Sequence, residues 1–195
     1  MLYKIYDNIL PKSVVNNAEN ILTSNQFPWF LSLKTVYRPG GFSDTNQHYN
    51  QKYKDKCSFK HSFTLGEPPS VFSEYYKFAK HLLDQIVSSI GIKKYLLLRA
   101  RANYTYPLPI NEPEIPLIPH TDRQYNHTVI LYYVSDSDGD TVFLDNNNNI
   151  ITTIKPAKGR FIVFDGTILH TNYFPKFHDK RIVINYNVLM KYNYV

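Results

Sequence analysis

Two stretches in the first half of the chain carry apolar residues at the three- to four-residue spacing of an amphipathic helix. The first is residues 11–23, whose apolar stripe consists of Val14, Val15, Ala18, Ile21 and Leu22. The second, residues 70–90, follows Pro68 and Pro69 and stops at Gly91, and its apolar side consists of Phe72, Tyr75, Phe78, Ala79, Leu82, Ile86 and Ile90. The pattern predicts two helices that pack against a larger body.

The segment between these helices, residues 42–63, is polar, rich in tyrosine and without a clear period. It predicts a long loop with one strand near residues 58–63. Long loops in compact domains often carry function, so His48 and His61 are candidates for substrate contact. Ordinary surface histidines are the simpler interpretation of both, and His81, beside lysines in the second helix, is expected to be structural or exposed.

From residue 95 onward the pattern changes to short β-branched and aromatic runs separated by turn sequences such as SDSDGD, DNNNN and KPAKG. The runs predict strands at 95–104, 116–120, 128–134, 140–145, 150–154, 160–165, 168–172 and 181–189. Many short strands around one core are typical of a double-sheet jelly roll, also called a double-stranded β-helix. The sequence therefore predicts a mainly β fold with flanking α-helices.

Length and composition limit the number of domains and the kinds of metal site that the chain can form. At 195 residues the chain is expected to form one domain, 1–195, with a jelly-roll core at 95–190 and a supporting, substrate-framing region at 1–94. Cys57 is the only cysteine, which excludes an internal disulfide and a cysteine-rich zinc site. A metal here must be bound by histidine and carboxylate, and a cytoplasmic location is expected. No amino-terminal basic and apolar signal or long apolar run argues for secretion or a membrane span.

The chain is basic, with a formal net charge of +6 and 17 tyrosines and 12 phenylalanines. Lysine and arginine neutralise phosphates while aromatic faces stack on bases, so nucleic-acid binding is one interpretation. The other is a compositional bias toward Lys, Asn, Ile and Tyr, as an AT-rich genome would produce, with no partner selected. Charge alone favours the second.

The stretch LIPHTDRQYNH, residues 117–127, places His120 and Asp122 two positions apart. In an extended strand such residues point to the same side, so both side chains can bind one ion. His170, in RFIVFDGTILHTN after a turn at Gly166, is the candidate for a third ligand, because a jelly roll can return its strand beside His120. Two histidines and one carboxylate leave three coordination positions open, as oxygen-activating Fe(II) requires.

Arg181 opens the last predicted strand, where its guanidinium could bind a carboxylate in bidentate fashion. A strand-end salt bridge, for example with Asp179, is the alternative. Along this strand one face carries Arg181, Val183, Asn185 and Asn187, and the other carries Ile182, Ile184, Tyr186 and Val188. The two asparagines either line the barrel interior and contact cosubstrate or substrate, or face solvent. Arg123 and His127 follow the ligand pair at the mouth of the site and could contact substrate, but ordinary surface positions are favoured for both.

Four sequence features in this order resemble the Fe(II)- and 2-oxoglutarate-dependent dioxygenases, in the branch similar to prolyl 4-hydroxylases and small phage oxygenases. They are PHTD, HTVILYYVSDSDGDTVFLD, KPAKGRFIVFDGTILH and KRIVINYNV, and they span roughly residues 95–190. Carried to this chain, the resemblance implies that His120, Asp122 and His170 bind Fe(II). These three residues and Arg181 would form the catalytic set.

The resemblance also implies a site for 2-oxoglutarate. Arg181 would pair with its C5 carboxylate, and Tyr133 matches a tyrosine of the family that reaches the same group. Asn103 matches an asparagine near the cosubstrate in several branches. Some hydroxylases use a lysine for the carboxylate, so Lys180 is an alternative to Arg181. Ascorbate would be an optional accessory reductant.

The implied reaction consumes dioxygen and 2-oxoglutarate, yields succinate and hydroxylates a substrate carbon. A protein or peptide side chain such as proline is the favoured substrate. An oxygenase acting on nucleic acid or a nucleotide is the second hypothesis, because the chain is basic and aromatic. A non-enzymatic jelly-roll or cupin-like metal-binding module is the third. No membrane partner is expected.

Overall fold

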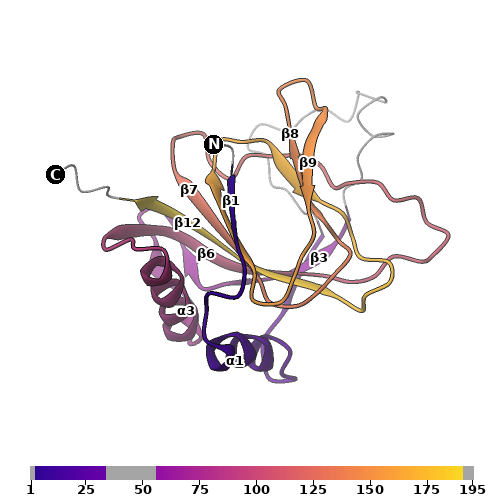
Figure 1. Cartoon of the computed structure of the whole chain (residues 1–195). Helices are drawn as coiled ribbons and strands as arrows, with labels where there is room; N and C mark the ends of the chain where they lie inside the picture. The colour runs from indigo at the N-terminus through magenta and orange to yellow at the C-terminus, as the bar shows by residue number, and fades with distance from the viewer. Residues whose placement is uncertain (1–2, 34–55, 191–195) are drawn as a thin grey trace.

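The computed structural model of the chain describes residues 3–33 and 56–190 (Figure 1). A seven-stranded antiparallel sheet has the order β1-β10-β7-β12-β6-β3-β2. Its strands are β1 (Tyr3–Tyr6), β10 (Phe161–Asp165), β7 (Thr128–Tyr133), β12 (Arg181–Met190), β6 (Tyr95–Thr105), β3 (Ser58–Ser62) and β2 (Phe30–Ser32).

A smaller sheet has the order β11-β8-β9 and consists of β11 (His170–Asn172), β8 (Thr141–Leu144) and β9 (Ile150–Ile154). The hairpin β4 (Thr64–Leu65) and β5 (Ser70–Val71) precedes the second helix. The helices are α1 (Lys12–Leu22) and α3 (Tyr76–Ser89), and Figure 1 shows them on the opposite side of the molecule from β8 and β9.

Alternate residues of the large sheet belong to two separate hydrophobic cores, one on each face of the sheet. On β12, Ile182, Ile184 and Tyr186 pack with the helices, whereas Val183 packs with residues of the small sheet. Because successive side chains of a strand point to opposite faces, the large sheet packs against the helices on one face and against the small sheet on the other. The predicted mainly β fold with flanking helices and two facing sheets is confirmed.

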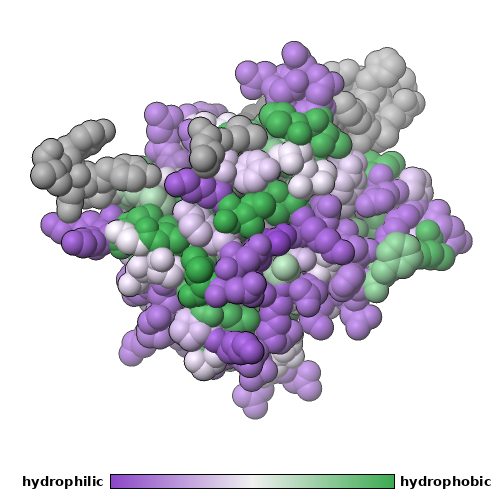
Figure 2. Space-filling model, viewed as in Figure 1, coloured by the Kyte–Doolittle hydropathy of each residue, from purple (hydrophilic) through white to green (hydrophobic). Residues whose placement is uncertain are grey.

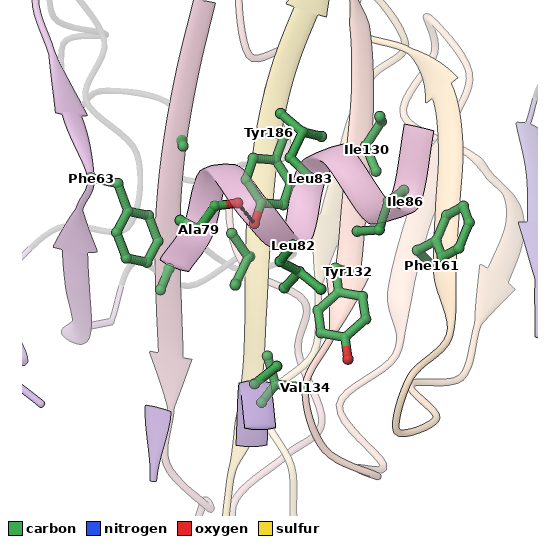
Figure 3. Packing of buried hydrophobic residues seen from close by; sticks show 14 of the residues in the cluster. Phe63, Ala79, Leu82, Leu83, Ile86, Ile130, Tyr132, Val134, Phe161 and Tyr186 are labelled. Carbon is green, nitrogen blue, oxygen red and sulfur yellow. Dashed lines mark hydrogen bonds between the residues drawn. The ribbon is translucent and has the colours of Figure 1, made fainter. Parts of the chain in front are cut away.

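The core between sheet and helices is apolar apart from the hydroxyl groups of two buried tyrosines, Tyr132 and Tyr186 (Figure 3). Figure 3 shows Leu82, Leu83 and Ile86 of α3 lying over the strands, beside Tyr186. The Tyr186 hydroxyl donates a 2.8 Å hydrogen bond to the Ala79 carbonyl oxygen of α3. This bond ties the last strand to the helix that covers it, and it satisfies a polar group that burial would otherwise penalise.

The second helix begins six residues later than the sequence pattern suggests. Residues 70 and 71 pair with β4 instead, and Phe72, expected to be buried, is 61% exposed. The helix starts after Ser73, whose hydroxyl accepts a 3.0 Å hydrogen bond from the Tyr75 backbone N–H. This local serine interaction competes with helix extension toward the amino terminus.

Seven of the eight strands predicted after residue 95 are present, and so is the strand near residues 58–63. The predicted strand 116–120 is wrong, since only single bridging residues occur there. Pro116 and Pro119 carry no N–H group, so this segment cannot form a continuous ladder. The short strands β1 and β2 at the sheet edges were not predicted.

The surface is mixed in character. On the face shown in Figure 2, hydrophilic residues predominate and hydrophobic residues form separate patches. Within residues 3–33 and 56–190, neither helix has the length and apolar character needed to cross a membrane.

The packing of α3 predicts the effect of a single truncation. Leu83 is fully buried, so Leu83→Ala should lower the free energy of unfolding by about 2–5 kcal/mol, through lost burial and the resulting cavity. Leu96→Ala is the matched control, because Leu96 is 52% exposed, and it should change stability by less than about 0.5 kcal/mol. Urea denaturation measures both. Equal losses in the two variants would contradict the assigned core.

Candidate metal centre

The backbone brings His120 and His170 together as directly opposed residues of an antiparallel bridge. Each backbone N–H donates to the carbonyl oxygen of the other at 3.0 Å. Leu117 extends the pairing, because its N–H donates to Asn172 and its carbonyl oxygen accepts from the Thr171 hydroxyl. The predicted strand is therefore reduced to two contact points, yet these suffice to position His120 beside β11.

The ligand atoms of His120, Asp122 and His170 all lie within 4.8 Å of one another. The Nδ1 atom of His170 lies 2.9 Å from the Ile168 carbonyl oxygen, and that of His120 lies 3.4 Å from the Ile118 carbonyl oxygen. A carbonyl partner on Nδ1 orients the ring and leaves Nε2 for a metal. The structure thus brings the three predicted ligands together in an arrangement that fits a two-histidine, one-carboxylate metal site.

Asp122 is held from two sides. Its Oδ2 atom accepts 2.9 Å hydrogen bonds from the amides of Asn185 and Asn187, and its Oδ1 atom forms an ion pair with Arg99. A carboxylate offers about four lone-pair positions, so three are used and one remains for a metal. Asn185 and Asn187 therefore face the interior, as one of the two alternatives had it, and the groups they contact there are the Asp122 carboxylate and each other.

The electrostatics keep Asp122 and His120 in their metal-binding forms. Burial alone would raise the pKa of Asp122, but Arg99, the two histidines and the Asn185 amide outweigh it and hold this pKa well below its usual range. Burial, followed by the neighbouring His170, lowers the pKa of His120 to about 3. A metal needs neutral imidazole and ionised carboxylate, so at neutral pH protons do not compete at these two residues.

Arg181 is buried in a second polar cluster on the same sheet face. Its Nε donates to the Gly139 carbonyl oxygen at 2.7 Å, and its Nη2 donates to the Thr141 hydroxyl at 2.9 Å. The Tyr133 hydroxyl lies 2.7 Å from the same threonine oxygen. Burial raises the pKa of Tyr133 to about 12, so the phenol stays protonated and can donate a hydrogen bond. Asp179 is not a partner of Arg181.

Gly139 is required by this cluster. A Cβ atom at this position would lie 2.7 Å from the Tyr173 carbonyl oxygen and 2.9 Å from Cδ of Arg181. Any larger residue would therefore displace the guanidinium from the position that the Gly139 carbonyl fixes. The sequence suggested only a turn here.

The register of β6 and β12 places these groups in order along one face. Arg181 lies opposite Thr105, Val183 opposite Asn103 and next to Tyr133 of β7, and Asn185 opposite Arg101. Asn103 therefore lies between the Asp122 contacts and the Arg181 cluster. Lys180 precedes β12 and is partly exposed.

Two arginines near the ligands were not identified in the sequence. Arg99 and Arg101 alternate with the buried Ala100 and Ala102, which pack toward the helices, so both guanidinium groups lie on the interior face. This polar and apolar alternation in LRARAN was the available signal. Burial, and then the nearby Arg99, lowers the pKa of Arg101 to about 10.

The other candidate residues have structural or peripheral positions. His61 is buried, with its ring nitrogens 2.7 Å from the Pro28 carbonyl oxygen and the Ser73 hydroxyl, so its expected surface position is wrong. His127 is also buried, against Gly166, where an added Cβ would meet its ring at 2.0 Å. Arg123 forms an ion pair with Glu67. His81 is exposed, and His48 lies outside the described residues.

Comparisons with known proteins identify the fold. No protein-family model and no curated protein matches the sequence. Among solved structures, an oxidoreductase of the 2OG-Fe(II) oxygenase family from Burkholderia pseudomallei matches 91% of this chain and 78% of its own, with a TM-score of 0.62 and 13% identity. The viral collagen prolyl hydroxylase of Paramecium Bursaria Chlorella virus-1, in complex with 2OG, matches with 96% coverage of both chains, a TM-score of 0.53 and 16% identity.

A third similar structure is HygX from Streptomyces hygroscopicus, with nickel, 2-oxoglutarate and hygromycin B bound. It covers 97% of this chain and 83% of its own, with a TM-score of 0.53 and 9% identity. The chain therefore has the double-stranded β-helix fold of 2OG-Fe(II) oxygenases, including prolyl hydroxylases, and it contains a His-Asp-His triad. At these identities the likeness establishes the fold.

The lowered pKa of His120 predicts acid sensitivity of the metal-free protein. Below about pH 6.5 the unfolded chain gains a proton on His120, whereas the folded chain does not until about pH 3. The free energy of unfolding should therefore fall on acidification, by on the order of 2 kcal/mol between about pH 6.5 and about pH 4.5 from this residue.

Urea denaturation with a chelator present, repeated across this pH range, measures the effect. His120→Gln should show a shallower loss, and His81→Gln, at an exposed position, should behave as the unmodified protein. Identical pH slopes in all three proteins would show that His120 titrates normally in the fold.

Proposed function

We propose that the protein is an Fe(II)- and 2-oxoglutarate-dependent dioxygenase that hydroxylates a substrate carbon and converts 2-oxoglutarate to succinate. The observation that carries the proposal is the convergence of His120, Asp122 and His170 within 4.8 Å, inside the fold of this enzyme class. When bound, the iron and cosubstrate supply the oxidative chemistry, and the protein supplies position, orientation and exclusion of water.

Different residues of the chain would bind the metal and hold its ligands in position. His120 and His170 each offer a ring nitrogen, fixed by the bridge between their backbones, and Asp122 offers the remaining lone pair of a carboxylate that three donors hold in place. The Nδ1 contacts with backbone carbonyls keep both rings in one tautomer. Because the orienting groups are preformed, the triad needs little rearrangement to accept a metal.

Arg181 is proposed to bind the C5 carboxylate of 2-oxoglutarate. Two of its nitrogens are fixed by Gly139 and Thr141, and Nη1 donates no hydrogen bond to any residue in the described ranges. Tyr133 supplies a second donor beside it. Lys180 lies outside the strand and is partly exposed, so the interior position favours Arg181. Asn103, between this cluster and the triad, is proposed to line the cosubstrate site.

A protein or peptide side chain is the proposed substrate, supported by the likeness to the viral collagen prolyl hydroxylase over nearly the whole chain. A nucleotide or nucleic acid is the second candidate, supported by the net charge of +6. Binding of a peptide and of an oligonucleotide, each repeated at rising salt, separates the two. Oligonucleotide binding should weaken steeply with salt if phosphates carry it.

A cytoplasmic location is part of the proposal, because Fe(II) and the single free thiol of Cys57 both suit reducing conditions. Ascorbate dependence stays a prediction from the resemblance.

Succinate formation tests the proposed activity. Purified protein supplied with Fe(II), 2-oxoglutarate and air should release succinate, and His170→Ala should lower the rate at least about 100-fold by removing a ligand. His81→Ala, at an exposed position on α3, is the control and should keep the full rate. Succinate release that is unchanged in His170→Ala would exclude the triad as its source.

The cosubstrate assignment predicts different results at two neighbouring residues. Arg181→Ala should weaken 2-oxoglutarate binding to the Mn(II)-loaded protein about 10- to 100-fold, since a charge-assisted hydrogen bond contributes about 1.5–3 kcal/mol. Lys180→Ala should change the dissociation constant less than about twofold. Anaerobic isothermal titration measures both. The reverse pattern would assign the carboxylate to Lys180.

A further inference from the structure

Two cationic side chains lie beside the metal triad without a role in binding the metal. Arg99 and Arg101 face the barrel interior from β6, directly opposite Asn187 and Asn185 of β12. Both asparagines donate to Asp122, which fixes the position of the triad over this part of the sheet. The two guanidinium groups are therefore next to the site where a substrate must bind.

Arg99 has a partner and Arg101 does not. Arg99 forms an ion pair with Asp122, whereas the Arg101 side chain has no hydrogen bond or ion pair with any described residue. Its Nε is fully buried, as is Nε of Arg99. A cation withdrawn from water without a partner is costly, and such groups in folded proteins usually meet a ligand or water.

Asn187 adds a second unpartnered group on the same face. Its side chain is fully buried and its Oδ1 atom has no hydrogen-bond partner, although its amide nitrogen donates to Asp122 and Asn185. A donor-rich guanidinium and an open acceptor thus lie side by side around the carboxylate. This is the composition of a polar binding site, and it differs from the apolar positions Val129, Leu131 and Val183 of the same face, which pack with the small sheet.

The position of Arg101 separates it from the proposed cosubstrate group. Arg181 lies opposite Thr105, whereas Arg101 lies opposite Asn185, four residues further along β12. At about 3.3 Å per residue the two backbone positions are about 13 Å apart along the strand. Asn103 and Val183 lie between them. The sheet therefore presents two separate cationic positions, one on each side of this pair.

The sum of the charges at the loaded site also favours an anionic substrate. A metal dication, the Asp122 carboxylate, a dianionic cosubstrate and Arg181 together carry no net charge. The charges of Arg99 and Arg101 are then left uncompensated in a partly buried site, where attraction for an anion is stronger than in water. A neutral substrate would leave this excess positive charge, and an anionic substrate would reduce it.

We propose that Arg101, supported by Arg99, binds a carboxylate or phosphate group of the primary substrate. This inference rests on the proposed dioxygenase function and specifies its substrate class. The guanidinium fork matches either oxyanion in bidentate geometry. An uncharged proline side chain offers it no partner, so within the peptide hypothesis the residue oxidised is an acidic or phosphorylated one, or directly adjoins one.

Stability gives a first test that is independent of activity. Because Arg101 is unpartnered without substrate, Arg101→Met should raise the melting temperature of the substrate-free protein. Arg99→Met should lower it, since Asp122 then loses its cationic partner. Lys77→Met, on the exposed side of α3, makes the same change in net charge and should leave the melting temperature unchanged. A lowered melting temperature in Arg101→Met would assign this residue a structural role and overturn the proposal.

Anion binding gives the decisive test. The protein loaded with Mn(II) and 2-oxoglutarate, without oxygen, is titrated with inorganic phosphate and separately with acetate at constant ionic strength. Saturable binding of at least one anion is expected in the unmodified protein and in Lys77→Met. It should weaken at least tenfold in Arg101→Met and less in Arg101→Lys, which keeps the charge. The anion that binds more tightly identifies a phosphate or a carboxylate substrate.

Three results would overturn the proposal. The first is that neither anion binds saturably. The second is that Arg101→Met binds the anion as tightly as the unmodified protein does, which would indicate that the anion coordinates the metal. The third is that Arg101→Met loses as much affinity for 2-oxoglutarate as Arg181→Ala does. The last result would place Arg101 in the cosubstrate site. If the unmodified protein binds no 2-oxoglutarate, the dioxygenase function itself fails. The anion titration of the Mn(II)-loaded protein then still reports on Arg101 separately.

Discussion

The ionised carboxylate of Asp122 is the constraint on which the interior of the barrel depends. Its side chain is only 1% exposed, and a carboxylate at this depth would take up a proton unless donors compensated its charge. Arg99 comes from β6, and Asn185 and Asn187 come from β12, so the compensation depends on the register of these two strands. A one-residue slip of either strand would move its donors to the opposite face.

This constraint explains why the central strands differ so strongly on their two faces. Toward the helices, β6 offers Ala100 and Ala102, which leave room for α3 to pack closely. Toward the interior it offers arginines and an asparagine. Burial of the apolar face favours folding, whereas an unpartnered buried charge on the polar face is expected to oppose it. Such a division is expected where part of a sheet is shaped for binding instead of packing.

Much of the fold followed from pattern alone, and the exceptions have physical causes. Strands from 128 onward lie in apolar runs bounded by recognisable turn sequences, whereas the short edge strands Tyr3–Tyr6 and Phe30–Ser32 lie outside such a succession of runs and turns. They exist because they pair with β10 and β3. The prolines at 116 and 119 were visible in the sequence, and they should have excluded a continuous strand there.

The candidate site was predictable in its ligands and less so in its surroundings. His120, Asp122 and His170 were identifiable from residue type and spacing, and the structure brings them together. The contacts of Arg99 with Asp122, and of Gly139 with Arg181, join segments far apart in the chain. Such contacts depend on sheet register, which a single sequence does not specify. Assigning faces to the segment LRARAN would have shown that two arginines point inward.

The most direct test of the account is anaerobic absorption spectroscopy of the Fe(II)-loaded protein. A metal held by two histidines and one carboxylate keeps positions open for a chelating ligand. Addition of 2-oxoglutarate should therefore produce a weak visible charge-transfer band in the unmodified protein, and the band should be absent in Asp122→Ala. A folded protein that binds Fe(II) yet shows no band would contradict the account, and a metal-binding module without this cosubstrate would take its place.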